Sequence, residues 1–242
     1  MLEGASLAVE DGCFVSLVGP SGSGKSSLLR AIIGLQEPLS GAVETGLPRS
    51  QVGILFQDDA LLPWKTARDN VALGLILNGV DGRTAREQAE AWLARLDLSG
   101  FGDRFPRHLS GGQRKRVALA QVLAMQPKLI LMDEPFASLD ALTREQLYLD
   151  IQKIWQERRK TIVFVTHNVR EAACLGDRVV VFGVHPGRIR AEFIIGLARL
   201  RDINSVAVAN YASVITGALK GTLISGEIPK SFSPEEVAAL AS

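Results

Sequence analysis

A glycine-rich loop of defined spacing constrains this chain more than any other feature. The segment "GPSGSGKSS", residues 19–27, fits the pattern G-x-x-x-x-G-K-[ST]. It directly follows the apolar run "FVSLV" and opens the helical pattern "KSSLLRAIIGL". Backbone N–H groups in such a loop and the positive end of the helix dipole both point at an anion. The segment therefore predicts a phosphate-binding loop between a buried strand and a helix; the alternative is a flexible turn.

Short apolar runs alternate with longer helical patterns along the chain, which predicts an α/β fold with a parallel sheet covered by helices. We expect strands at residues 14–18, 52–56, 129–132, 161–165 and 178–182. We expect helices at residues 25–35, 84–96, 113–125, 143–158 and 169–175. Residues 63–110 show a helical pattern without an intervening strand, which indicates a helical insertion between sheet strands.

Composition narrows the class of protein. The 242 residues carry a formal net charge of +1, so a broad nucleic-acid-binding surface is not expected. Cys13 and Cys174 are too few and too far apart for a disulfide framework, which favours a reducing cytosolic setting. The N-terminal segment resembles neither a signal peptide nor a transit peptide. The uncharged stretch Ile203–Leu219 contains five polar residues and predicts no membrane span, although an amphipathic helix on a partner or a membrane surface stays open.

Two carboxylates follow the apolar run "LILM". Asp133 and Glu134 can both face one ligand if the strand ends there, and Pro135 favours such an end. At a phosphoryl-transfer site Asp133 would hold Mg²⁺ and Glu134 would polarise the attacking water. The alternative is two solvated carboxylates in a loop.

Two further polar residues end other expected strands. His167 follows "TIVFVT" and could hydrogen-bond a terminal phosphate, although a histidine at a strand end is more often structural. Gln57 closes "VGILFQ" and could touch Mg²⁺ or water, or it could be an ordinary surface glutamine. In the glycine-rich loop, Lys25 would reach the outer phosphates and the Ser26 hydroxyl would hold Mg²⁺.

A second glycine-rich helix start lies in "LSGGQRKRV", residues 109–117. Ser110, Gly111 and Gly112 precede an expected helix and form a second anion-binding start. The cations at 114–116 lie in the first turn, where the helix dipole disfavours them, so we expect them to face acidic groups or phosphate. Without the other motifs, an N-cap with a solvated basic face would be the simpler interpretation.

Together these motifs resemble the ATP-binding subunits of ABC transporters, from about Ala5 to Ile195. "GPSGSGKS" resembles the Walker A loop, "LSGGQ" the family signature and "LILMDE" the Walker B motif. Gln57 resembles the Q-loop glutamine, "SLD" at 138–140 the D-loop and His167 the H-loop histidine. Six motifs in the family's order make the resemblance specific.

The resemblance implies a P-loop NTPase (RecA-like) fold with a parallel sheet core and a helical insertion carrying the signature. It implies an ATP-binding domain at 1–196, with a helical subdomain at about 63–125, followed by a tail at 197–242 to which no role is assigned. The implied ATP-binding residues are Gly19, Pro20, Ser21, Gly22, Ser23, Gly24, Lys25, Ser26 and Ser27. The implied catalytic residues are Glu134, His167 and Gln57, and the implied Mg²⁺ ligands are Ser26, Gln57 and Asp133. In a head-to-tail dimer, Ser110, Gly111, Gly112 and Gln113 would close over the partner's ATP, and Asp140 would lie in the D-loop.

Within the family, "LLPWKTARDNVALGL" and "HPGRI" resemble importers of nitrate, sulfonate and taurine. This resemblance implies a homodimer, peripheral on the cytoplasmic side of the inner membrane, that binds permease subunits near residues 57–64. A solute-binding protein outside the membrane would act indirectly, and nucleic acid is not an expected partner. The transported solute is not readable from these residues.

Two alternatives remain. A soluble ABC-type ATPase acting on nucleic acid or ribosomes typically has long coiled-coil inserts or tandem cassettes, and salt-sensitive nucleic-acid binding would support it. A non-catalytic regulatory subunit is suggested by the absence of an aromatic residue before Phe14 to stack on adenine and by the unassigned tail. Absence of ATPase activity above a Glu134→Gln control would favour it.

Overall fold

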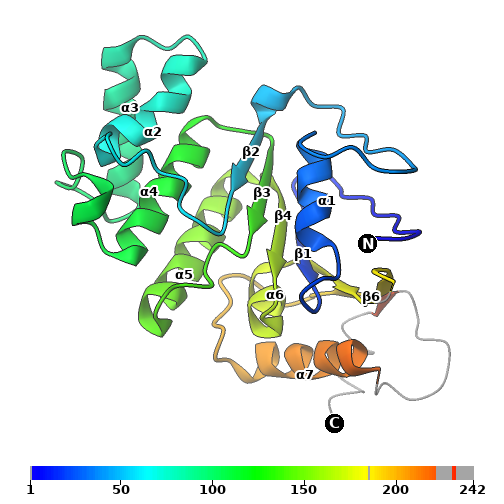
Figure 1. Ribbon diagram of the computed structural model, residues 1–242. Coiled ribbons are helices and arrows are strands. Elements are labelled where there is room, and N and C mark those ends of the chain that lie inside the picture. Colours follow the sequence, from blue (N-terminus) through cyan, green and yellow to red (C-terminus); the bar gives the residue numbers. More distant parts are fainter. Residues whose placement is uncertain (1, 185, 222–230, 233–242) are drawn as a thin grey trace. The chain divides into compact units, whose positions relative to one another are not determined.

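The structure is a computed structural model that describes residues 2–184, 186–221 and 231–232 (Figure 1). Contacts divide the chain into two compact units. Unit 1 comprises Met1–Gly46 and Ile151–Ser242, and unit 2 comprises Leu47–Asp150. Helix α5, Ala141–Arg158, contributes residues to both units.

The strands of unit 1 follow the expected α/β pattern with two additions, β6 and β7. The central strand β1, Phe14–Val18, is buried throughout and pairs in parallel with β4, Thr161–Thr166, and with β5, Arg178–Phe182. Strand β6, Ile189–Ile194, is antiparallel to β5, so the sheet is mixed rather than purely parallel. The connection between β5 and β6 is too short for a parallel crossover and forces a hairpin. Strand β7, Ser231–Phe232, pairs with β6.

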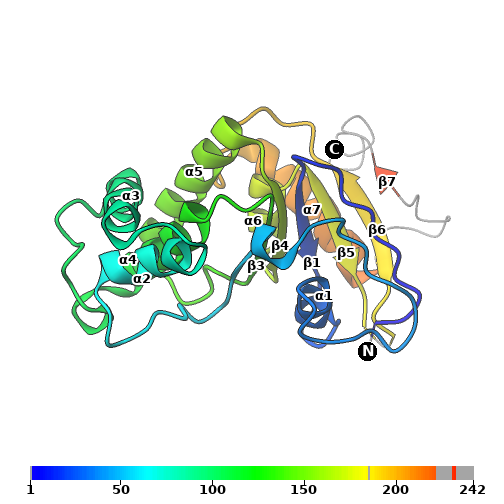
Figure 2. The same cartoon turned by 90° about the horizontal axis from the view of Figure 1, so that it is seen from above.

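Helix α1, Lys25–Ile32, lies to one side of these strands (Figure 2). It ends three residues before the expected Leu35, because the chain turns at Gly34, whose φ is 72°. Helix α6, Val169–Leu175, has its expected bounds.

The segment expected to be a tail after residue 196 is part of the packing of unit 1. Helix α7, Val206–Lys220, contacts α6 and strands β5 and β6. Its buried residues recur with helical spacing at Val208, Tyr211, Ile215 and Ala218, within one hydrophobic cluster with α6 and the strands. The packed core of unit 1 thus continues beyond the expected boundary. None of the helices described here is long and apolar enough to cross a membrane.

Unit 2 joins two parallel strands to a group of helices. Strand β2, Val52–Leu55, pairs with β3, Leu129–Asp133. Helices α2, Ala67–Leu77, α3, Gly82–Arg95, and α4, Gly111–Ala124, pack against one another. Short 3-10 helices occupy Arg49–Gln51 and Pro106–His108. The unit starts before the expected insert at residue 63, because β2 packs with α4 and pairs with β3.

Side-chain caps set the starts of two of these helices. Asp81 accepts hydrogen bonds from the N–H groups of Arg83 and Thr84, so α3 begins at Gly82 rather than at Thr84. Ser110 caps α4, which begins at Gly111 rather than at the expected Gln113.

Candidate functional site

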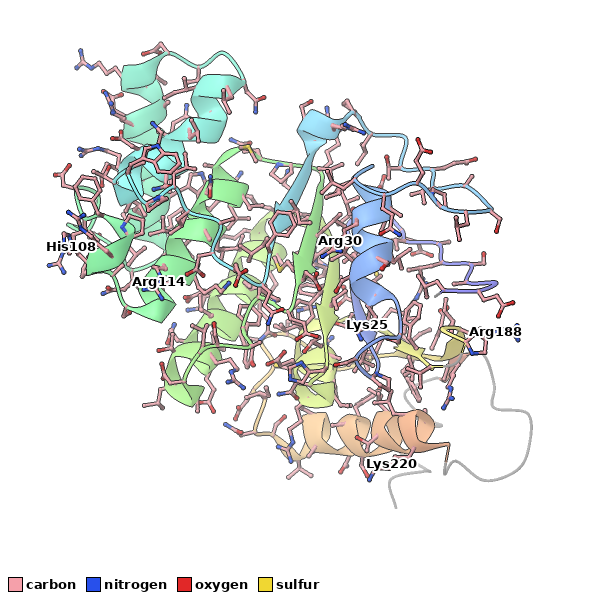
Figure 3. All side chains as sticks on the ribbon, viewed as in Figure 1. Lys25, Arg30, His108, Arg114, Arg188 and Lys220 are labelled. Atoms are coloured by element: carbon pink, nitrogen blue, oxygen red, sulfur yellow. The ribbon has the colours of Figure 1, made fainter. Side chains whose placement is uncertain are left out.

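The glycine-rich segment of residues 19–27 follows β1; residues 19–24 form the loop and residues 25–27 begin α1. The Lys25 ammonium at the start of α1 donates to the carbonyls of Gly19, at 2.8 Å, and Pro20, at 2.9 Å, and to the Ser23 hydroxyl at 3.0 Å (Figure 3). The Lys25 side chain is therefore folded back on the loop and only 5% exposed. A charge at this depth is stabilised by its three acceptors, and it lies where an anion held by the loop would meet it.

Glycine is required at both ends of the loop. Gly24 is the N-cap of α1 with φ of 91°, and no side chain caps the first turn. A Cβ at Gly19 would lie 2.7 Å from the carbonyl oxygen of Phe182, too close for any side chain. A helix start without a side-chain cap presents its N–H groups to an anion, so the local geometry suits phosphate.

Strand register places His167 at the same edge of unit 1 as this loop. Val18 pairs with Thr166 in the parallel β1–β4 ladder, so Gly19 and His167 each come directly after paired residues. The His167 side chain is exposed.

Buried groups brace the turn that carries His167. Thr166 donates from its hydroxyl to the Glu171 carboxylate at 2.6 Å, and the same hydroxyl oxygen accepts from the N–H of Asn168 at 3.0 Å. Asn168 caps α6 by accepting from the N–H of Arg170. Thr166 and Glu171 were not among the expected site residues; the available signal was their position on either side of His167 in the sequence.

The edge of the β2–β3 pair gathers the other expected residues in unit 2. Leu55 pairs with Met132, so Gln57 and the Asp133–Glu134 pair lie just past paired residues of adjacent parallel strands. Strand β3 ends at Asp133, as expected if Asp133 and Glu134 are both to face one ligand. Glu134 has φ of 44°, a left-handed conformation that is uncommon for a residue with a side chain. Such local strain is characteristic of residues held for a function.

The second glycine-rich start forms a capping box. The Ser110 hydroxyl accepts from the N–H of Gln113 at 3.2 Å, and the Gln113 side-chain oxygen accepts from the N–H of Ser110 at 2.9 Å. Gly112 lies against Thr143, which a Cβ at Gly112 would meet at 2.3 Å. Ser110 is exposed and is therefore accessible to a ligand.

Asp140 caps the start of α5. Its carboxylate accepts from the N–H of Thr143 at 3.0 Å. The backbone and side-chain hydrogen bonds from Thr143 hold the pKa of Asp140 below its ordinary value. Asp140 is thus anionic at neutral pH, and it is exposed.

The basic residues at the start of α4 face acidic groups, one of the two expected outcomes. Arg114 and Lys115 both pair with Asp59, each at 3.0 Å. Arg116 pairs with Asp97 at 3.1 Å and Asp150 at 3.4 Å. The alternative was a basic face in contact with solvent. Lys115 does not fit that alternative, because its side chain is only 4% exposed.

The sequence profile described as ABC transporter matches residues 2–137, more than half of the chain. The chain belongs to the ABC transporter family. An uncharacterised ABC transporter ATP-binding protein of Methanocaldococcus jannaschii is 43% identical, over 92% of this chain and 85% of the relative. An aliphatic sulfonates import ATP-binding protein of Burkholderia lata is 43% identical over 93% of this chain and 68% of the relative. A nitrate import ATP-binding protein of Synechocystis sp. is 43% identical over 81% of this chain and 76% of the relative.

Solved ABC transporter cassettes share the fold. A dimeric bacterial cassette has a TM-score of 0.72 and 34% identity, covering 81% of this chain and 91% of that one. A dimeric post-hydrolysis state bound to ADP and phosphate has a TM-score of 0.71 with the same identity and coverage. These likenesses confirm the P-loop NTPase fold and the ABC assignment made from the motifs. The chain is an ATP-binding subunit of an ABC transporter and an ATPase, which favours transport over the nucleic-acid and regulatory alternatives.

Proposed function

We propose that this ABC subunit hydrolyses MgATP as half of a head-to-tail homodimer and drives the import of a small sulfonate or nitrate-like anion. One observation carries the proposal: the chain holds two separate glycine-rich helix starts, one at Gly24 in unit 1 and one at Ser110 in unit 2. The first supplies the loop that binds phosphate within a chain. The second, exposed at Ser110, supplies the contact to a phosphate held by the partner.

The residues assigned to Mg²⁺ fit that ion. Ser26 in the first turn of α1, Gln57 after β2 and Asp133 at the end of β3 offer hydroxyl, amide and carboxylate oxygens. Mg²⁺ prefers oxygen ligands and commonly takes only one or two carboxylates together with substrate phosphates. When bound, the ion would neutralise charge on the phosphate oxygens during phosphoryl transfer.

The chain's own groups divide the work of hydrolysis. Lys25 and the N–H groups at the start of α1 bind the phosphates and balance their charge. Glu134 accepts a hydrogen bond from the attacking water and orients it, while His167 donates to the terminal phosphate. Gln57 senses that phosphate through its neutral amide.

The segment after Gln57 supports a permease partner. Trp64 is 70% exposed and Phe56 is 36% exposed, and both lie within ten residues of the glutamine. Aromatic side chains are enriched in protein–protein interfaces relative to the rest of the protein surface. A cytoplasmic segment of a permease subunit is the proposed occupant, which would place the ATPase on the cytoplasmic face of the inner membrane.

The molar mass of the Glu134→Gln protein, measured by light scattering with and without MgATP, tests the dimer. Glu134→Gln should bind ATP, stall before hydrolysis and change from monomer to dimer only with ATP. The exposed substitution Glu87→Gln is the matched control, because it makes the same chemical change away from the site and should retain ATPase activity. A Glu134→Gln protein that binds ATP and stays monomeric would contradict the sandwich.

The solute is tested with the permease and its solute-binding protein in proteoliposomes. Ethanesulfonate or nitrate on the outside should raise ATP hydrolysis inside, and chloride should not. Equal hydrolysis with all three anions would refute the proposed solute class.

A further inference from the structure

Lys115 lies in α4, five residues after Ser110, and reaches back to the segment that carries Gln57. Its ammonium contacts the carbonyl oxygen of Phe56 at 3.3 Å, the carbonyl oxygen of Gln57, and the carboxylate of Asp59 at 3.0 Å. Only 4% of the Lys115 side chain is exposed. One buried cation therefore holds the main chain on which the glutamine is carried.

Arg114 strengthens the same connection. Its Nε donates to the second carboxylate oxygen of Asp59 at 3.0 Å, so α4 binds both oxygens of that side chain (Figure 3). Its Nη1 donates to the carbonyl of Leu109 at 2.9 Å, directly before the signature serine. Hydrogen bonds thus run continuously from Leu109 through Arg114 to Asp59.

The burial of Lys115 makes this connection stiff. Desolvation of an ammonium is costly unless acceptors surround it, and here two carbonyls and one carboxylate do so. If α4 moved without the segment that carries Gln57, the Lys115 ammonium would lose these three acceptors. The two segments are therefore expected to move together.

We propose that Lys115 is a positioning residue that couples Gln57 to the signature start at Ser110. A change at Gln57 when the terminal phosphate is bound or lost would shift α4, and closure of Ser110 on a partner's ATP would in turn position Gln57, because coupling between sites is reciprocal. The proposal rests on the ATP roles given above to Gln57 and Ser110.

The test compares three variants, Lys115→Gln, Lys115→Arg and Arg116→Gln. ATP-dependent dimerisation of each is measured in protein that also carries Glu134→Gln, and ATP hydrolysis is measured in protein with the native Glu134. Arg116→Gln is the matched control, since it removes the same charge from the next position of α4, where the partners are Asp97 and Asp150. Lys115→Gln should raise the ATP concentration at which half of the protein is dimeric by about tenfold, and it should lower kcat by about tenfold. The Kd of a single chain for a fluorescent ATP analogue should change by less than about threefold. Lys115→Arg should restore both, and Arg116→Gln should leave both near wild type.

Wild-type dimerisation and kcat in Lys115→Gln would overturn the coupling, as would failure of Lys115→Arg to restore them. A second measurement needs no nucleotide: a double-mutant cycle in urea with Lys115→Gln and Asp59→Asn. The unfolding equilibrium constants should deviate from additivity by about fivefold or more, and additive effects would remove the physical basis of the coupling. If Glu134→Gln alone fails to dimerise while this cycle shows coupling, the dimer proposal fails and the tether between α4 and the Gln57 segment stands.

Discussion

The hydroxyl of Thr166 donates a 2.6 Å hydrogen bond to the carboxylate of Glu171, and both side chains are buried. The bond closes the turn that presents His167. Glu171→Ala should therefore lower kcat by about tenfold with little change in KM, because the histidine loses its support while the phosphate-binding loop is intact. Glu171→Gln keeps an acceptor for Thr166 and should restore most of the rate.

Steady-state ATPase kinetics check this prediction, with Glu10→Ala as an exposed carboxylate control in the same unit. A wild-type kcat in Glu171→Ala would show that the turn holds His167 without this bond. A loss in Glu171→Gln equal to that in Glu171→Ala would instead indicate that the charge of Glu171 matters.

Lys25→Ala should weaken binding of a fluorescent ATP analogue by at least about tenfold and abolish phosphate release. The substitution removes the cation that balances the phosphate charge and three hydrogen bonds that shape the loop. Arg30→Ala, another cation of α1 that is exposed, should change binding by less than about twofold (Figure 3). Equal weakening in both variants would point to general electrostatics rather than to the loop.

Ser110→Arg and Ser110→Ala separate the capping role of Ser110 from its proposed contact with the partner's ATP. Both lose the capping box, which should cost about 1 kcal/mol in the free energy of unfolding. Both should keep the Kd of a single chain for the ATP analogue, since the loop of residues 19–27 is unchanged. Only Ser110→Arg should block ATP-dependent dimerisation completely, because its bulk stands where the two chains would meet. Normal hydrolysis by Ser110→Arg would refute the contact in trans.

Arg201→Met should lower the free energy of unfolding by about 3 kcal/mol or more, measured in urea. Arg201 is 5% exposed and donates to main-chain carbonyls, including those of Ala173, at 3.1 Å, and Ile195, at 3.2 Å. Burial lowers the pKa of Arg201 to about 10, so the guanidinium is still charged at neutral pH. Lys153→Met, an exposed cation in the same unit, should have little effect. Equal stability of the two variants would show that the segment before α7 adds nothing to unit 1.

Local sequence signals predicted most of the elements that carry the motifs. The strands at 14–18 and 178–182 and the helix at 169–175 have their expected bounds, because apolar runs and a capping Asn168 act over a few residues. The starts of α3 and α4 were expected two residues too late, since the side chains of Asp81 and Ser110 extend each helix backward. Strand β6 was not expected, although its polar and apolar side chains alternate from Arg190 to Phe193 and its burial follows the same alternation.

The sequence by itself determined the family and the ATPase activity, because the spacing in 19–27, the carboxylates at the end of β3 and the signature at 109–113 are local patterns that can be identified without the tertiary structure. Tertiary structure alone decided that Lys115 turns inward to Asp59 and the Gln57 carbonyl, since nothing within α4 distinguishes it from its neighbours Arg114 and Arg116. It also decided that α7 belongs to the core of unit 1, where the faces of α6, β5 and β6 bury it. The physical reason is the same in both cases: burial depends on surfaces supplied by segments distant in the chain, which local periodicity does not encode.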